Sequence, residues 1–443
     1  MKVSIVGTGY VGLVSGACLA HLGHQVTCVD IDPAKVDMIA RKDPPIYEKG
    51  LQELLDANVP ERLTATTDLR SAVLASDLSL IAVGTPFDGQ IIDLKYIKQV
   101  AKEIGEALRD KDGWHMVVVK STVVPGTTTE VVLPILEEAS GKTAGIDFGV
   151  GMNPEFLREG EAIEDFMEPD RIVFGGIDER SIDALAELYE VFEHADKVRT
   201  DPSTAEMIKY TANSLLATLI SFSNEIANLC AAQNVDVAEA MQGVHLDRRF
   251  SPILDNGERV RPGFVSYVWP GAGFGGSCFP KDVKALVAHG ENAGIPMQLL
   301  RSVIDVNNRQ PQKMIDMLEA GLGDVSGAPI TVLGVAFKPG TDDIRESPSL
   351  PVIKTLADKG AQITAFDPIA RHEAEQALGD AVVFKDTLED ALKGAKAILL
   401  MTAWPEFNAL PGKLSAGEDA PLLIDGRRML SKDSVARYAG IGL

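Results

Sequence analysis

The chain has 443 residues, of which 45% are hydrophobic and 24% are charged, values typical of a globular protein. A chain of this length exceeds one comfortable core, so we expect two or three domains. Its formal net charge of −22 argues against nucleic-acid binding by bulk electrostatics, and an anionic ligand would need a local cluster of Lys and Arg.

The cysteine content and the N-terminus favour a cytoplasmic protein. Four scattered cysteines are too few for a disulfide framework, and no Cys-x-x-Cys pair suggests a zinc or other metal site. The chain opens on a strand pattern, MKVSIVG, without the features of a signal peptide. No run approaches about 18 consecutive apolar residues, so no membrane span is predicted.

Short apolar runs alternate with helical patterns in the first third of the chain, which predicts an α/β domain with a parallel sheet. The pattern turns helical from about residue 204, and the alternation returns after residue 329. We therefore predict an α/β fold of two Rossmann-like parallel-sheet domains, joined by a long central helix and a helical middle region. The expected domains are 1–200, 201–320 and 321–443; the expected strands are 3–6, 25–29, 78–83, 116–119, 330–335, 362–366, 395–401 and 422–424; and the expected helices of the middle region are 204–232, 235–242, 281–293 and 298–319.

The sequence Gly7-Thr8-Gly9-Tyr10-Val11-Gly12 lies between the first predicted strand and helix, the context in which GxGxxG indicates dinucleotide binding. Gly7 permits a tight turn, Gly9 lets the backbone approach a pyrophosphate, and Gly12 allows the helix to pack closely on the strand. The helix N-terminus supplies unpaired N–H groups to the phosphates.

Asp30 ends the second predicted strand and can accept hydrogen bonds from both hydroxyls of an adenosine ribose. A 2′-phosphate would meet Asp30 and Asp32 at close range, so we predict NAD rather than NADP. Lys35 could reach a ribose or a phosphate, or could be a solvated helix lysine.

Two further motifs follow strands at their carboxyl ends, where ligands bind in open α/β sheets. They are Gly84-Thr85-Pro86 and Lys120-Ser121-Thr122. Thr122 is the stronger candidate for chemistry, with an ordinary capping threonine as the alternative.

Cys278 lies in Gly275-Gly276-Ser277-Cys278-Phe279-Pro280-Lys281-Asp282. Pro280 favours the first turn of a helix, which places Cys278 near the cap, where backbone N–H groups stabilise a thiolate. A nucleophilic cysteine would let a dehydrogenase hold an aldehyde covalently and oxidise it again. The apolar surroundings of Cys18, Cys28 and Cys230 predict packing roles instead.

Two pairs of residues at i, i+4 spacing could complete a site. Lys209 and Asn213 project from one face of the long helix and could stabilise an oxyanion, or could be a solvated lysine and a packing asparagine. Glu155 and Glu159 follow a turn led by Pro154, and one could activate water. Asp282 could instead orient a lysine or a water.

The chain resembles the UDP-glucose 6-dehydrogenase family, within the wider nucleotide-sugar dehydrogenases, over essentially its whole length. Nine motifs occur in the family's order: VGTGYVGL at the start, PPIYEKGL at 44–51, VGTP at 83–86, KSTVVPGT at 120–127, NPEFLREG at 153–160, PDRIVFGG at 169–176, AEMIKYTANSLLA at 205–217, GFGGSCFPKD at 273–282 and AFKPGTDDIRES at 336–347.

The resemblance implies an NAD-dependent, four-electron oxidation of UDP-glucose to UDP-glucuronate. It makes Cys278 the nucleophile that forms a thiohemiacetal and then a thioester. Lys209 and Asn213 would stabilise oxyanions, and Thr122 and Asp282 would support a catalytic water. Glu155 is the leading candidate for the base in thioester hydrolysis, with Glu159 second.

The resemblance also assigns binding roles and an assembly. It implies NAD binding by residues 1–200, dimerisation through 201–320 and UDP binding by 321–443, in a homodimer or higher homo-oligomer. An arginine near residue 248 would reach the partner's substrate, and Arg249 is our choice. The segment 251–269 departs from the family's compact linker and is either a surface insertion or a lid or subunit-contact arm. The implied cofactor contacts are Gly7, Gly9, Tyr10, Val11, Gly12, Asp30, Lys35, Thr85, Thr122, Glu159 and Arg345; the implied substrate contacts are Glu155, Phe156, Leu157, Arg158, Lys209, Asn213, Arg249, Tyr267, Gly275, Lys338 and Arg427.

Three alternatives stay open at this point. Relatives that act on GDP-mannose or UDP-N-acetylmannosamine share the catalytic motifs. A dehydrogenase that transfers a single hydride would need no cysteine. A regulatory protein could bind NAD without turnover.

Overall fold

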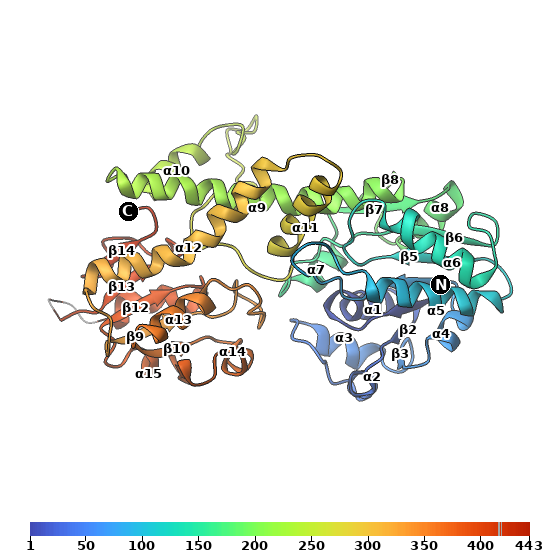
Figure 1. The fold of residues 1–443 in the computed structure, drawn as a ribbon, viewed down its shortest axis with the longest axis horizontal. Coiled ribbons are helices and arrows are strands. Elements are labelled where there is room, and N and C mark those ends of the chain that lie inside the picture. The colour runs from blue at the N-terminus through green and yellow to red at the C-terminus, as the bar shows by residue number, and fades with distance from the viewer. Residues whose placement is uncertain (415–416, 418) are drawn as a thin grey trace. The chain divides into compact units, whose positions relative to one another are not determined.

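The fold is described from a computed structural model of the chain, for residues 1–414, 417 and 419–443. It divides into two compact units, Met1–Ala212 (unit 1) and Asn213–Leu443 (unit 2), and the boundary falls within helix α9 (Pro202–Ala232). Figure 1 shows one sheet in each unit, coloured blue to green in unit 1 and orange to red in unit 2.

Unit 1 contains an eight-stranded sheet with the order β3-β2-β1-β4-β5-β6-β7-β8. The order reverses between β1 and β4, which are parallel neighbours, so the edge beyond these strands is where a doubly wound sheet binds ligands. The elements are β1 (Lys2–Val6), α1 (Tyr10–His21), β2 (Gln25–Val29), α2 (Pro33–Ala40), α3 (Leu51–Asn58), β3 (Leu63–Thr66), α4 (Leu69–Ala75), β4 (Leu78–Ile81), α5 (Lys95–Arg109), β5 (His115–Val119), the π-helix η1 (Thr127–Val132), α6 (Leu133–Ser140), β6 (Phe148–Met152), α7 (Ala162–Met167), β7 (Arg171–Gly176), α8 (Glu179–Leu188) and β8 (Asp196–Thr200).

Side chains on successive residues of these strands enter two different cores, one on each face of the sheet. Val3 and Ile5 pack with residues of α1, α3, α7 and α8, whereas Val6 packs with residues of α4, α5 and α6. Because side chains alternate along a strand, a strand that is buried on both faces reads as a continuous apolar run. This explains why the strands of unit 1 could be located as short apolar runs.

Unit 2 contains a six-stranded parallel sheet with the order β11-β10-β9-β12-β13-β14. Its C-terminal end lies beside α10, where the Val237 backbone N–H donates to the Gly442 carbonyl at 2.9 Å (Figure 1). The elements are α10 (Val237–His245), η2 (Gly263–Tyr267), α11 (Phe279–Asn292), α12 (Gln298–Leu322), β9 (Pro329–Leu333), α13 (Ser349–Asp358), β10 (Gln362–Phe366), α14 (Arg371–Leu378), η3 (Gly379–Ala381), β11 (Val383–Phe384), α15 (Leu388–Leu392), β12 (Ala397–Leu400), η4 (Pro405–Ala409), α16 (Leu410–Lys413), β13 (Leu422–Asp425) and β14 (Tyr438–Gly440).

The expected strands and helices are confirmed, with ends that differ by a few residues, and both sheets have Rossmann-like strand orders. One pair departs from the expected parallel sheet, since β6 and β7 run antiparallel, with Gly151 opposite Gly176. The sequence interpretation gave no bounds for β3, β6, β7, β8, β11 and β14. For β8 the reason is plain, because Asp196–Thr200 reads DKVRT and lies mostly exposed. The segment 251–269 is irregular apart from η2 and one bridge between Ile253 and Arg259.

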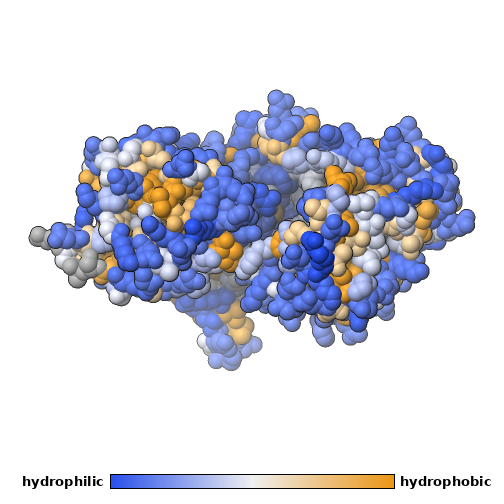
Figure 2. All heavy atoms as spheres, turned by 90° about the horizontal axis from the view of Figure 1, so that it is seen from below, coloured by the Kyte–Doolittle hydropathy of each residue, from blue (hydrophilic) through white to orange (hydrophobic). Residues whose placement is uncertain are grey.

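Helix α9 carries an exposed apolar stripe within unit 2. Leu215, Phe222 and Leu229 follow one another at seven-residue spacing and are 58%, 51% and 58% exposed. Among the described residues, α9 is the one helix long and apolar enough to cross a membrane by length and composition. That is weak evidence, because core helices pass the same test. The surface in Figure 2 is mostly hydrophilic with smaller apolar patches, as the high charge predicts.

Candidate active site

The turn between β1 and α1 has the geometry of a phosphate-binding loop. Gly7 has a φ of +100°, and a Cβ there would lie 2.6 Å from the Ala82 carbonyl oxygen. A Cβ on Gly12 would lie 1.9 Å from the Gly7 carbonyl oxygen, so only glycine fits where α1 meets the turn. Gly9 faces open space and caps α1 without a side-chain hydrogen bond. The first turn of α1 can therefore present backbone N–H groups to a pyrophosphate, which fits a dinucleotide.

Asp30 follows β2 and lies beside this loop. Its Oδ2 accepts hydrogen bonds from the Thr8 backbone N–H at 2.8 Å and the Thr8 hydroxyl at 2.5 Å, and its Oδ1 accepts from the Asp32 N–H at 3.0 Å. Burial alone would raise the pKa of Asp30, but these hydrogen bonds and the charge of Lys35 hold it below its usual range. An ionised carboxylate at this place can accept hydrogen bonds from ribose hydroxyls and would repel a 2′-phosphate.

We expect Asp30→Asn to raise KM for NAD by roughly ten- to a hundredfold, because a charged acceptor is lost at the ribose. The preference for NAD over NADP, measured as the ratio of kcat/KM in initial-rate assays, should fall by a similar factor. Asp68→Asn is the matched control, because Asp68 also accepts from a backbone N–H in unit 1 but caps α4. An unchanged cofactor preference in Asp30→Asn would contradict this role.

Glu48 joins the start of α1 to the turn at Glu159 and Gly160. The Tyr10 hydroxyl donates to the Glu48 carboxylate, which also accepts from the Gly160 N–H at 2.7 Å and the Ala162 N–H at 3.0 Å. Burial, together with Glu48, raises the pKa of Tyr10, so its phenol stays protonated. The sequence interpretation quoted the motif around Glu48 but gave this residue no role.

The predicted residues Thr85 and Thr122 lie together at the carboxyl edge of the sheet. The Thr85 hydroxyl donates to the Thr122 carbonyl oxygen at 2.8 Å, and the Ser121 hydroxyl donates to the Val83 carbonyl oxygen at 2.7 Å. These bonds tie the loop after β4 to the loop after β5, because β4 and β5 are neighbouring parallel strands. The predicted cofactor residues Val11 and Lys35 are half-buried, on α1 and α2 respectively.

Glu155 and Lys209 form a buried ion pair in unit 1. The Lys209 Nζ lies 2.9 Å from the Glu155 Oε1, and the two side chains are only 4% and 5% exposed. The Leu157 N–H donates to the other carboxylate oxygen at 2.7 Å. Burial favours the neutral acid, but Lys209 and the hydrogen bonds outweigh it and lower the pKa of Glu155. Glu155 is therefore a carboxylate at neutral pH. The neighbouring Phe156 ring contacts two cations, with Arg171 at 3.9 Å and the Lys209 Nζ at 5.6 Å from its centroid.

In unit 2, Cys278 is the N-cap residue of α11, and Pro280 lies in the first turn, as the sequence predicted. Cys278 is half-buried, whereas Cys18, Cys28 and Cys230 are buried. Burial raises the pKa of the Cys18 and Cys28 thiols to about 12, so these remain protonated packing residues. The position of Cys278 at a helix N-terminus instead favours a thiolate.

Asp282 lies one turn further along α11 and is 1% exposed. Its Oδ2 accepts a hydrogen bond from the Asn213 amide at 2.7 Å, and its Oδ1 pairs with the Lys281 ammonium at 2.7 Å. The Asp282 N–H also donates to the Cys278 carbonyl at 2.8 Å. The structure thus connects Asn213, Asp282 and Cys278 within unit 2.

The glycines before Cys278 pack against the loop that follows β9. A Cβ on Gly275 would lie 2.4 Å from the Glu346 carbonyl oxygen, and one on Gly276 would lie 2.9 Å from the Phe337 ring. The Gly276 N–H donates to the Arg345 carbonyl at 2.8 Å. Bulkier residues would therefore displace the loop that carries Cys278.

The turn after β9 repeats the geometry of the turn after β1. Gly334 has a φ of +88°, and Asp367, which follows β10, accepts from the Val335 and Ala336 N–H groups at 2.7 and 3.1 Å. Asp367 also accepts from the Trp404 indole at 3.2 Å and is 5% exposed. Its carboxylate is thus buried by protein partners, unlike the half-buried Asp30. The sequence interpretation missed Asp367. Its position directly after the second strand of unit 2, like that of Asp30 after β2, could have indicated its role.

Several predicted binding arginines have protein partners in this structure. Arg158 pairs with Asp165 at 2.6 Å and with Glu161 at 2.5 Å, Arg345 pairs with Asp343 at 2.7 Å, and the exposed Arg249 pairs with Asp247 at 2.6 Å. Arg427 is half-buried and donates to carbonyl oxygens, among them that of Gly273 at 3.3 Å. Burial lowers the pKa of Arg427 to about 10, so it stays charged at neutral pH.

Two further predicted substrate contacts lie in unit 2. Lys338 is half-buried after β9, and Tyr267 ends η2 beside Phe279.

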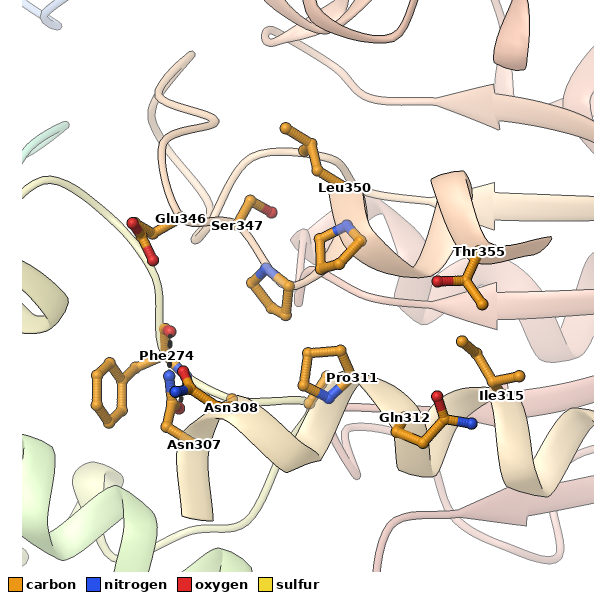
Figure 3. A pocket seen from close by; sticks show the side chains of 14 residues that line it. Phe274, Asn307, Asn308, Pro311, Gln312, Ile315, Glu346, Ser347, Leu350 and Thr355 are labelled. Carbon is orange, nitrogen blue, oxygen red and sulfur yellow. Dashed lines mark hydrogen bonds between the residues drawn. The ribbon is translucent and has the colours of Figure 1, made fainter. Parts of the chain in front are cut away.

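A pocket in unit 2 lies between α12 and α13 (Figure 3) and has a volume of about 390 Å³. Its wall includes Phe274, whose backbone N–H and carbonyl bind the Asn307 side chain at 2.8 and 3.0 Å. Pro311 of α12 and Leu350 of α13 both line the pocket. Asn307 therefore anchors the segment that leads to Cys278.

Three consecutive parts of the chain match the domains of one protein family. Residues 1–193 match the NAD binding domain of the UDP-glucose/GDP-mannose dehydrogenase family, residues 203–309 its central domain, and residues 331–432 its UDP binding domain.

Relatives are similar over the whole chain. The UDP-glucose 6-dehydrogenase of Haloferax volcanii is 42% identical over 446 residues, covering 100% of both chains. The GDP-mannose 6-dehydrogenase of Azotobacter vinelandii is 41% identical, covering 94% of this chain and 95% of its own. The solved structure of a UDP-glucose dehydrogenase from Pyrobaculum islandicum has a TM-score of 0.90 at 38% identity, covering 100% of this chain and 97% of its own.

Two nucleotide-binding sheets, a dinucleotide loop and a half-buried cysteine at a helix cap define an NAD-dependent dehydrogenase of nucleotide sugars. The chain belongs to the UDP-glucose/GDP-mannose dehydrogenase family, and NAD is its cofactor.

Proposed function

We propose that the protein oxidises C6 of UDP-glucose to a carboxylate, with two NAD per turnover, through intermediates covalently bound to Cys278. The position of Cys278 at the N-terminus of α11 carries the proposal, because a thiol in this environment is suited to attack an aldehyde. A dehydrogenase that performs one hydride transfer has no need of it.

The proposed reaction consists of two oxidations and one hydrolysis. NAD, when bound, accepts a hydride in each oxidation. The C6 alcohol first loses a hydride and a proton to give an aldehyde, and the Cys278 thiolate adds to its carbon to give a thiohemiacetal. Loss of a second hydride and proton gives a thioester. Water then cleaves the carbon–sulfur bond, which releases the carboxylate and restores the thiol.

The remaining catalytic residues act on these steps. Lys209 and Asn213 donate to the oxyanion of the covalent intermediates, because an ammonium and an amide each carry more than one N–H. Thr122 and Asp282 support the hydrolytic water. Glu155 accepts a proton from this water, because its lowered pKa keeps it ionised, and Glu159 is the second candidate.

The binding roles are proposals of the same kind. NAD is bound by Gly7, Gly9, Tyr10, Val11, Gly12, Asp30, Lys35, Thr85, Thr122, Glu159 and Arg345, and the nucleotide sugar by Glu155, Phe156, Leu157, Arg158, Lys209, Asn213, Arg249, Tyr267, Gly275, Lys338 and Arg427. Arg158, Arg249 and Arg345 would exchange or share their carboxylate partners when ligand binds, which a diphosphate favours because Arg pairs with it bidentately.

The relatives differ in the nucleotide sugar that their names give as the substrate. Identity to UDP-glucose and GDP-mannose enzymes is nearly equal, at 42% and 41%. The TM-scores favour UDP-glucose, at 0.90 for that enzyme of Pyrobaculum islandicum against 0.55 for a GDP-mannose dehydrogenase of Pseudomonas aeruginosa. UDP-N-acetylmannosamine is the other candidate, since a dehydrogenase for it from Pyrococcus horikoshii has a TM-score of 0.83 at 28% identity.

Initial rates with UDP-glucose, GDP-mannose and UDP-N-acetylmannosamine test this assignment. We expect kcat/KM for UDP-glucose to exceed the others by at least roughly a hundredfold, because a site that hydrogen-bonds one base leaves polar groups unpaired with another. Preference for either other sugar would overturn the substrate and leave the chemistry in place.

We further propose a cytoplasmic homodimer or higher homo-oligomer, with the three-part organisation 1–200, 201–320 and 321–443. The exposed stripe of Leu215, Phe222 and Leu229 supports assembly through α9, since seven-residue spacing gives one apolar seam along a helix. Arg249 would then act on the partner's substrate.

Phe222→Glu should convert the dimer to a monomer, because it places a charge in the centre of this seam. Light scattering after size exclusion gives the mass directly. Val383→Glu is the control, because Val383 is 57% exposed on β11, away from α9. A dimer that survives Phe222→Glu would contradict the proposed interface.

A further inference from the structure

Lys120 is a buried lysine for which the proposed chemistry has no use. It follows β5, is 3% exposed, and its Nζ donates to the Asn153 side-chain oxygen at 2.8 Å. The Tyr189 hydroxyl lies 3.4 Å from the same Nζ and donates to the same Asn153 oxygen at 2.7 Å. Asn153 and Tyr189 are both neutral, and a buried ammonium with neutral hydrogen-bond partners is costly to maintain unless a negative charge lies nearby.

Asn153 connects Lys120 to the turn that carries Glu155. Its backbone N–H donates to the Val119 carbonyl at 2.9 Å, and its side-chain N–H donates to the Val173 carbonyl at 3.0 Å. Asn153 is therefore held by strands β5 and β7 and by Lys120. Glu155 is two residues further on, beyond Pro154, whose fixed φ limits how far the turn can move.

Glu155 interacts with the charges of two lysines. Lys120, Glu155 and Lys209 are all buried in unit 1, and the charges of both lysines act to lower the pKa of Glu155. Burial lowers the pKa of Lys120 to about 8, while the charge of Glu155 opposes this and that of Lys209 adds to it. Around this cluster, Tyr189 stays a neutral phenol because burial raises its pKa, and Arg171 lies over the Phe156 ring.

We propose that Lys120 is a positioning residue for the reaction: it fixes the Asn153–Glu155 turn through Asn153, and its charge helps to keep Glu155 ionised beside Lys209. The proposal rests on the proposed function of Glu155 and Lys209. It predicts that the acid limb of the pH–rate profile reports Glu155 and depends on the charge of Lys120.

Two variants test this proposal, one by removing a positive charge near Glu155 and the other by adding a negative one. Lys120→Met removes the charge and the hydrogen bond, and Asn153→Asp keeps the size of the side chain, loses the N–H that donates to Val173 and places a carboxylate against Lys120. A carboxylate that loses a positive neighbour, or gains a negative one, has a higher pKa. Both variants should therefore move the acid limb of kcat to higher pH, by about one unit. We expect kcat to fall by roughly ten- to a hundredfold in Lys120→Met, with KM for both substrates within about threefold.

Lys111→Met is the matched control. Lys111 is also a partly buried lysine of unit 1 with a lowered pKa, but its Nζ donates to the carbonyl oxygens of Val73, Leu74 and Ser76. Lys111→Met should leave the acid limb of the kcat pH profile at its wild-type pH. Thermal unfolding of each variant separates loss of fold from loss of function.

The wild-type enzyme is assayed first with the three nucleotide sugars, so a wrong substrate is recognised before any variant is compared, and the best substrate is then used throughout. If Lys120→Met does not fold, the acid limb of Asn153→Asp alone tests the proposal. The proposal is overturned if the acid limb of the folded variants stays within about 0.2 unit of wild type, or if Lys111→Met shifts it equally.

Discussion

Replacing Cys278 by serine should reduce carboxylate formation by roughly a thousandfold or more, since an alcohol is a far weaker nucleophile than a thiolate at neutral pH. The aldehyde then has no thiolate to hold it for the second oxidation. Product analysis by mass spectrometry, together with NADH absorbance, measures both oxidations in one reaction.

Cys230→Ala is the control for this variant, because Cys230 is buried in α9 and serves packing. It should retain the wild-type ratio of NADH to carboxylate. Alkylation with iodoacetamide gives a second readout: it should inactivate wild type, and UDP-glucose should protect. Carboxylate formation by Cys278→Ser at a rate near wild type would remove Cys278 from the mechanism.

Replacing Lys209 by methionine should have the second large effect, lowering kcat by roughly a hundred- to a thousandfold, as the loss of an oxyanion donor does elsewhere. It should also destabilise the protein, because Glu155 loses its ion-pair partner at 2.9 Å while only 5% exposed. Removing one partner of a buried pair costs about 3–5 kcal/mol. For a unit of this size, that lowers Tm by roughly 6 °C or more.

The stability loss should be reversed, and the rate loss should not, when Glu155→Gln is added to Lys209→Met. The pH dependence gives a further check. The folded pKa of Glu155 is lowered, so the ion pair stabilises the fold fully above the ordinary carboxyl pKa of about 4.3 and loses this effect as pH falls through the folded value. Equal stability of Lys209→Met and wild type at pH 7 would contradict the pairing.

Features that depend on local sequence could be predicted. The glycine loop, Asp30 and the capping position of Cys278 all lie within a strand–turn–helix or loop–helix junction, where spacing fixes geometry. Long-range pairing could not be read from the chain. Glu155 meets Lys209 across more than fifty residues, and Asn213 meets Asp282 across 69.

The carboxylate partners of the arginines also could not be predicted from the sequence, for a different reason. In an acidic chain, any arginine has many carboxylates within reach, and the sequence does not say that Arg158 selects Asp165. Lys120 was quoted within a motif but given no chemistry, because its importance depends on burial and on Asn153. The antiparallel β7 was missed because chain direction is set by the connection and not by apolar content.

The most direct test of the central claim is the stoichiometry of the wild-type reaction with UDP-glucose. NADH released per UDP-glucose consumed is measured by absorbance, and the product is identified by mass. The covalent cysteine mechanism predicts two NADH for each UDP-glucuronate. One NADH with an aldehyde product would contradict it.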